Sequence, residues 1–206
     1  MGSAFEKKNC RQEICTDIGL SVALIFFTIS KQKKVMENST VQTTQQTGVI
    51  VINPDEVLRH WQGHRELTRR MIEAFPEKEL YEYSIGGMRP FADLAMEMIN
   101  MAAPGIKGLA TNEWSKSWAA SERPVPKTKA ELLELWDEVT EQINIYWPQI
   151  PGHRFQEKIA AFGQWEGAGN WILFYFIDNE IHHRGQGYVY LRSLGIEPPP
   201  FWDRKQ

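Results

Sequence analysis

Apolar residues recur at helical spacing in four segments of this chain, and stretches rich in proline and glycine separate them. The first predicted helix begins at Pro54, because Asn53 is a good capping residue and proline fits the first helical position. It runs to about Phe75. The third predicted helix covers Lys129–Tyr146, after the capping residue Thr128.

The second and fourth helices are predicted from longer apolar runs. The second begins near Pro90 and reaches toward Pro104, and a continuation through Leu109 is left open. The fourth covers residues 170–194, which contain no proline. The stretch Phe155–Trp165 is interpreted as either a short helix or an ordered crossover, and no strand-like alternation is recognised. The chain is therefore predicted to form an all-α bundle of four principal helices.

The last predicted helix carries polar side chains inside an apolar pattern. At about 100° per residue, Asn179 and His183 share one face, together with Phe176, Gly187, Tyr190 and Leu194. His183 is therefore predicted to point inward, with Asn179 one turn before it, whereas His182 lies on a different flank. Burying such groups without partners costs free energy, so the pair indicates a site.

Two motifs in the chain resemble one family. The first lies in the last predicted helix and reads Glu180-Ile181-His182-His183-Arg184-Gly185-Gln186. The second lies upstream and reads Met88-Arg89-Pro90-Phe91-Ala92-Asp93-Leu94-Ala95-Met96-Glu97. Through them, residues 51–204 are similar to the DinB-like (DinB/YfiT) four-helix bundles. The C-terminal motif is the more specific of the two.

This resemblance implies a divalent-metal centre with changed ligands. The family is associated with three histidines that hold a metal, one on the second helix and two at i, i+4 on the last. The matching positions here are Glu97, Asn179 and His183, and only the last is histidine. The implied metal is zinc, nickel or manganese, and the site can also lack one. The resemblance further implies hydrolase or thiol-transferase chemistry on a small molecule, and association into a homodimer.

The residue types at these positions leave two functions open. Glu97 can supply an oxygen ligand, although it borders a polar stripe with Asp93 and Asn100 that is typical of a solvated helix edge. Asn179 offers an uncharged carbonyl oxygen, which suits calcium or a water-bridged contact better than zinc or nickel. The first hypothesis is a modified metal site built from Glu97, Asn179 and His183. The alternative is a metal-free bundle that binds a small molecule or a partner, or dimerises.

Four further polar residues are interpreted as structural. Glu180 and Arg184 have the i, i+4 spacing of a helical ion pair. Arg184 and Gln186 are expected to tie helices together. His64 lies on the apolar stripe of the first helix and is predicted to pack against a polar partner, with an approach to the metal cavity as the alternative. No residue pattern resembles a nucleophile with its base, so no catalytic residue is assigned.

Composition and charge narrow the class of partner. A formal net charge of −3 and a pI of about 6.0 argue against nucleic-acid binding, which usually requires a basic face. Eight tryptophans indicate a thick helical core or an aromatic-lined pocket. Both cysteines, Cys10 and Cys15, precede the bundle, so neither a disulfide nor a cysteine zinc site is predicted within it. A cytoplasmic protein is the default expectation.

Residues 1–50 are predicted to be an N-terminal extension to a domain at 51–206, disordered or upstream of the natural start. The apolar run Gly19–Ser30 is shorter than the ~20 residues of a membrane span. A poor signal sequence, a membrane-proximal anchor and residues upstream of a start at Met36 are the open interpretations. The abrupt change of composition favours the last of these, so the run is not taken to place the protein in a membrane.

Overall fold

Four long helices make up most of the described chain. The computed structural model describes residues 52–115 and 123–204, which belong to the unit Val51–Gln206. The apolar run at 19–30 and both cysteines lie outside these residues, and none of the described helices has the length and apolarity to cross a membrane. The long helices are α2 (Pro54–Ala74), α4 (Phe91–Thr111), α5 (Lys129–Tyr146) and α6 (Gly169–Ser193). The predicted helical bundle is confirmed.

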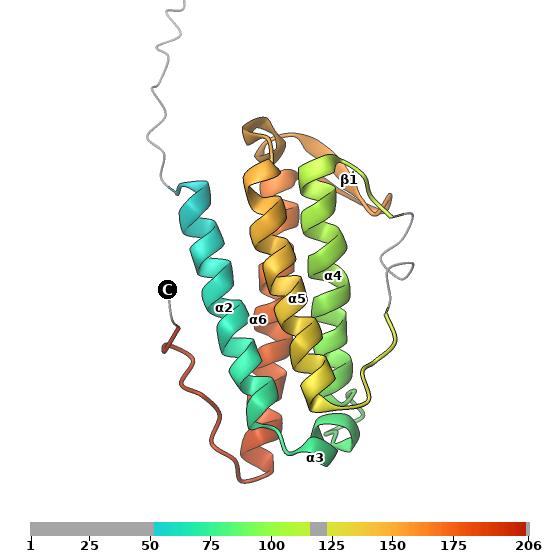
Figure 1. The fold of residues 1–206 in the computed structure, drawn as a ribbon, viewed down its shortest axis with the longest axis vertical. Coiled ribbons are helices and arrows are strands. Elements are labelled where there is room, and N and C mark those ends of the chain that lie inside the picture. The colour runs from blue at the N-terminus through green and yellow to red at the C-terminus, as the bar shows by residue number, and fades with distance from the viewer. Residues whose placement is uncertain (1–51, 116–122, 205–206) are drawn as a thin grey trace, which may run out of the picture. The chain divides into compact units, whose positions relative to one another are not determined.

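Helices α5 and α6 occupy opposite corners of the bundle. Each packs against both α2 and α4, so the four helices form a ring in the order α2, α5, α4, α6. In Figure 1, α2 and α6 run downward while α4 and α5 run upward. The short helix α3 (Glu77–Glu82) lies at the lower end of the bundle in that view, and β1 (Lys158–Ala161) at the upper end. Helix α6 therefore faces α2 on one side and α4 on the other.

The helices begin where local side-chain chemistry predicts. The Asn53 side chain accepts a hydrogen bond from the Glu56 backbone at 2.9 Å, and the Glu56 carboxylate accepts one from the Asn53 backbone at 3.2 Å. Thr128 and Glu131 form the same reciprocal box at the start of α5. Helix α4 continues through Pro104, because burial of its apolar face persists beyond the proline and outweighs the lost backbone hydrogen bond.

The expectation of a helix or crossover at 155–165 is wrong in part, because a β-hairpin begins at Lys158 and continues beyond Trp165. Strand β1 pairs antiparallel with β2 (Trp165–Ala168), and Ala161 lies opposite Trp165. Both central residues of the turn, Phe162 and Gly163, have positive φ, at 54° and 66°. Strands of four residues are too short to display a clear alternation, and Phe162 lacks the usual turn chemistry. Its ring is buried against Trp114, so tertiary packing sets the conformation.

Two glycines let α4 and α6 approach closely. A Cβ atom at Gly187 of α6 would lie 2.4 Å from the Phe91 ring of α4. Reciprocally, a Cβ atom at Gly105 of α4 would lie 2.5 Å from the Phe176 ring of α6. The aromatic rings fill the space that these glycines leave open. This close contact sets the positions of polar side chains that lie between the two helices.

A buried carboxylate joins α6 to α2. Glu180 is 2% exposed and accepts hydrogen bonds from Trp61 Nε1 at 3.3 Å and from Thr68 Oγ1 at 2.8 Å. Arg65, which is fully buried, lies 3.7 Å from the same carboxylate, and its guanidinium stacks on the Trp136 ring of α5. The predicted Glu180–Arg184 ion pair is present at 4.0 Å. Glu180 is therefore held by hydrogen bonds from α2 and by ion pairs with Arg65 and Arg184.

Replacing Glu180 with glutamine should strongly destabilise the fold. The substitution leaves the Arg65 guanidinium buried without a counter-charge, and breaking a buried pair in this way costs roughly 3–5 kcal/mol. The free energy of unfolding from urea titration measures the effect. As a matched control, Glu82→Gln breaks the exposed Lys78–Glu82 pair and should change stability by no more than about 0.5 kcal/mol. Equal losses in the two variants would contradict the central role of Glu180.

Candidate functional site between α4 and α6

The structure brings together the three side chains predicted to form a metal site. His183 Nε2 lies 2.9 Å from Glu97 Oε1, and the Asn179 amide donates to the same oxygen at 3.3 Å. His183 is buried, and Glu97 and Asn179 are partly buried. The inward direction of His183 and Asn179 follows the helical periodicity of α6. Glu97 faces them from α4, two turns into that helix. These three residues are called the α4–α6 centre below.

Two further side chains form hydrogen bonds with the centre. Arg89, which lies just before α4, pairs with Glu97 Oε2. Gln186, one turn beyond His183, lies with its Oε1 atom 2.8 Å from His183 Nδ1. Burial raises the pKa of Glu97, but hydrogen bonds from Arg89, His183 and Asn179 outweigh burial and hold this pKa below its usual value. Glu97 is therefore a carboxylate with both oxygens engaged.

The hydrogen-bond partners of His183 define the state of its ring. Glu97 Oε1 only accepts hydrogen bonds, so His183 Nε2 must carry a hydrogen to make this contact favourable. The Nδ1 atom either donates to Gln186 Oε1 or accepts from a Gln186 amide turned the other way. In both arrangements Nε2 points a hydrogen, rather than a lone pair, at the carboxylate.

As arranged, the α4–α6 centre does not fit a divalent metal. A metal ligand needs a free lone pair, yet His183 directs N–H at Glu97 and Asn179 directs its NH2 group there. Arg89 already supplies a positive charge to the other carboxylate oxygen. Among the described residues, no group of three or more His, Cys, Asp or Glu side chains is placed to hold an ion. Within the centre, Asn179 Oδ1 differs from the other polar atoms, because it is buried and has no hydrogen-bond partner among the described residues.

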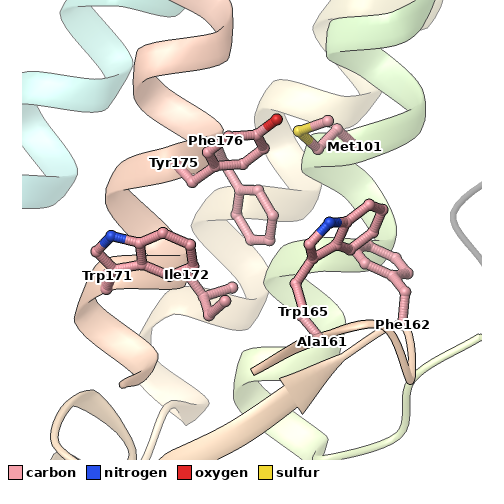
Figure 2. A pocket seen from close by; sticks show the side chains of 8 residues that line it. All are labelled: Met101, Ala161, Phe162, Trp165, Trp171, Ile172, Tyr175 and Phe176. Atoms are coloured by element: carbon pink, nitrogen blue, oxygen red, sulfur yellow. The ribbon is translucent and has the colours of Figure 1, made fainter. Parts of the chain in front are cut away.

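An apolar pocket lies beside this centre, between α6, α4 and the hairpin. Its volume is about 80 Å³, and it is lined by Met101, Ala161, Phe162, Trp165, Trp171, Ile172, Tyr175 and Phe176. Figure 2 shows Trp165 and Phe162 on the hairpin side, with Trp171 and Ile172 on the opposite wall. Tyr175 reaches across toward Met101 of α4 (Figure 2). Aromatic rings from α6 and the hairpin, together with Met101 of α4, therefore surround one small space.

The pocket and the centre occupy successive turns of the same two helices. Met101 follows Glu97 by four residues on α4, and Phe176 precedes Asn179 by three on α6. With a rise of ~1.5 Å per residue, the two features are separated by about one helical turn, or ~5–6 Å. A ligand in the pocket would thus have carboxylate, amide and imidazole groups beyond one end. The apolar pocket and the polar centre are therefore neighbouring features of the α4–α6 interface.

Some parts of this site carried no sequence signal. Arg89 lies before the start of α4, so helical periodicity could not predict the direction of its side chain. It does lie in one of the two motifs that resemble the DinB-like bundles. Trp165 and Phe162 belong to the hairpin that the pattern did not reveal. The high tryptophan content did suggest an aromatic-lined pocket. His64 does pack against polar partners as predicted, and these partners, His60, Arg184 and Arg204, lie away from the α4–α6 centre.

The chain is similar to bacterial proteins in sequence and in fold. It is 23% identical over 146 residues to the uncharacterized protein YrdA of Bacillus subtilis, covering 70% of this chain and 85% of the relative. It is 22% identical over 154 residues to the uncharacterized protein YjoA of the same organism, covering 73% and 97%. The crystal structure of the DinB-like protein YjoA from Bacillus subtilis superimposes with a TM-score of 0.60 at 18% identity, covering 73% of this chain and 99% of that one.

A second solved structure has the same fold. A DinB-like protein from Bacillus cereus matches with a TM-score of 0.57 at 19% identity, covering 71% of this chain and 95% of that one. At these identities the solved structures establish the bundle alone. The family follows from the sequence, because the model described as the DinB family matches residues 36–205, which include all four long helices. The chain therefore belongs to the DinB family.

Proposed function

We propose that this protein binds a small organic molecule in the aromatic pocket, without a metal ion, and that the α4–α6 centre closes the polar end of the site. The observation that carries the proposal is the pocket itself, whose walls are apolar and largely aromatic. Trp171, Tyr175 and Trp165 are 55%, 50% and 40% exposed at its edge. Exposed aromatic side chains that gather around a cavity are typical of a binding site.

The size of the pocket limits what it can hold. A space of about 80 Å³ accepts a single ring or a branched aliphatic group. Burying a group of that size stabilises a complex by roughly 1.5–3 kcal/mol, whereas micromolar affinity needs about 8 kcal/mol. The ligand must therefore extend beyond the pocket, and the exposed faces of Trp171 and Tyr175 are the adjacent apolar surface.

The α4–α6 centre supports binding better than catalysis. Both nitrogens of His183 and both oxygens of Glu97 already have partners, so neither is free to activate a nucleophile. A network of this kind gives the ligand a fixed polar boundary. The hydrolase or thiol-transferase activity implied by the family resemblance stays a prediction.

A modified divalent-metal centre of Glu97, Asn179 and His183 is the second candidate. The observation that favours it is the buried Asn179 Oδ1, because an unpartnered acceptor is costly and a cation would provide a partner. Against it stand the Arg89 charge on Glu97 and the N–H groups aimed at the carboxylate. The two candidates differ in a measurable property, which is the metal content.

Replacing Trp171 with alanine should weaken binding of an apolar ligand. The uncharged fluorescent probe N-phenyl-1-naphthylamine offers one ring for the pocket and a second ring system for its exposed edge. Loss of the Trp171 face removes an aromatic contact that contributes about 0.5–1.5 kcal/mol, which corresponds to roughly a two- to tenfold weaker dissociation constant. Fluorescence titration measures it.

Two further variants make this titration specific. Ala161→Leu adds three carbons at the pocket wall and should abolish binding by filling the space. Phe174→Ala removes an aromatic side chain that is 40% exposed on the same helix but does not line the pocket, and should leave the affinity unchanged. Identical affinities for the wild type and Ala161→Leu would place the probe elsewhere and refute the proposed site.

The purified protein should contain no tightly bound metal. After incubation of untagged protein with zinc, nickel or manganese and desalting, mass spectrometry should find below about 0.1 ion per chain, because the donors at the centre are protonated or paired. The double variant Glu97→His with Asn179→His is the positive control, since it restores the three histidines of the family pattern and should retain metal. About one ion per wild-type chain, lost in His183→Ala, would instead establish the second candidate.

A further inference from the structure

A second polar cluster lies on the opposite side of α6, where the C-terminal tail meets α2. His64 Nδ1 lies 2.8 Å from Arg184 Nη2, and His64 Nε2 lies 3.0 Å from Arg204 Nη1. His60, one turn before His64, places its Nε2 atom 3.1 Å from His64 Nε2. His64 and Arg184 are both 5% exposed. Three elements, α2, α6 and the tail, thus direct nitrogen atoms at one point.

The hydrogen bonding of this cluster is incomplete. Burial lowers the pKa of His64 to about 3, with further lowering by Arg184, His60 and Arg204, so the ring is neutral. A neutral imidazole accepts a hydrogen bond at one nitrogen only, and Arg184 donates to Nδ1. His64 Nε2 therefore carries the hydrogen, which His60 Nε2 can accept. Arg204 then directs an N–H group at another N–H group, and among the residues that the structure describes this donor has no side-chain acceptor.

The charges around the cluster are also unbalanced. Glu180 is the carboxylate nearest Arg184, at 4.0 Å, and it is shared with Arg65, Trp61 and Thr68. Arg204 has no carboxylate partner among the ion pairs of the described residues, and the neighbouring Asp203 pairs with Arg70. Two guanidinium groups therefore meet at a neutral imidazole, and the one carboxylate paired with either of them, Glu180, is shared with other donors. An incoming acceptor with negative charge would satisfy both deficits.

A metal ion is a poor occupant of this cluster. Two histidines at i, i+4 with ring nitrogens 3.1 Å apart resemble a chelating pair. However, the bond from Arg184 to Nδ1 places the hydrogen on the Nε2 atom that would have to bind the ion. The positive charges of Arg184 and Arg204 would repel the ion as well.

We propose that His60, His64, Arg184 and Arg204 form a binding site for an oxyanion group, a carboxylate or a phosphate, on a small organic ligand. Arg184 also lines a groove of about 320 Å³ between α6 and the C-terminal tail. Tyr188, Phe201 and Trp202 line the same groove, so they offer an apolar surface to the rest of such a ligand. This site is separate from the aromatic pocket and does not depend on the function proposed for it.

Thermal unfolding in the presence of oxyanions tests the proposal. The wild-type full chain is titrated with inorganic phosphate and, separately, with benzoate, against sodium chloride of matched ionic strength. Either anion should raise the melting temperature by about 3 °C or more at tenfold excess over its dissociation constant. Preference for benzoate would identify a carboxylate ligand with an apolar body, and preference for phosphate a phosphorylated one.

Two arginine variants separate a binding site from a structural contact. Arg204→Ala should weaken anion binding about tenfold or more, because it removes a charged donor, while the anion-free melting temperature does not fall. Arg59→Ala, an exposed residue of α2 outside the cluster, should leave anion binding unchanged. A lower anion-free melting temperature in Arg204→Ala, with no anion effect in the wild type beyond that of chloride, would show that Arg204 only holds the tail and would overturn the proposal.

Discussion

Helix α6 carries three buried polar side chains and one that is partly buried, all four of which need partners, and the rest of the structure depends on this constraint. Asn179 and His183 face α4, whereas Glu180 and Arg184 face α2. A buried polar group without a partner costs about 1–3 kcal/mol, and a buried charge costs more. A rotation of α6 by one residue, about 100°, would separate all four side chains from their partners. The two interfaces therefore fix the orientation of α6 together.

The two sides of α6 satisfy this constraint to different degrees. On the α4 side, Arg89 balances the negative charge of Glu97. The Asn179 amide and His183 Nε2 both donate hydrogen bonds to the Glu97 carboxylate. That centre is nearly complete by itself, and the unfilled space lies one turn away, in the aromatic pocket. On the α2 side, donors and positive charges exceed the available acceptors. The chemistry of the chain thus separates an apolar binding space from an anion-attracting one.

Periodicity and capping residues predict the helices of this protein well, and predict its connections poorly. Asn53 and Thr128 begin helices through hydrogen bonds to residues three positions away, so these helix starts are predictable from the sequence. His183 points inward because helical periodicity places it on the same face of α6 as buried residues such as Phe176 and Tyr190. The contact between Glu97 and His183, in contrast, joins residues 86 positions apart and depends on how α4 and α6 pack together. Only a family resemblance suggested it.

Other features are invisible in the sequence because they arise from tertiary contacts. The hairpin turn at Phe162 is held by burial of its ring rather than by turn chemistry. The contact between Arg204 and His64 joins residues 140 positions apart, with no local pattern at either end. Arg89 balances the charge of Glu97, although Arg89 lies outside α4, the helix that carries Glu97. Each case follows the same rule: long-range packing selects the partner, and local propensity does not.

The protonation of His183 tests the central claim of this account most directly. Nuclear magnetic resonance of the protein labelled with ¹⁵N in its histidine rings reports which ring nitrogens carry hydrogen. The account predicts a hydrogen on Nε2 that persists, with unchanged chemical shift, when zinc, nickel or manganese is added. An Nε2 atom without hydrogen, whose resonance shifts or broadens on addition of about one equivalent of metal, would contradict the account and make the α4–α6 centre a metal site.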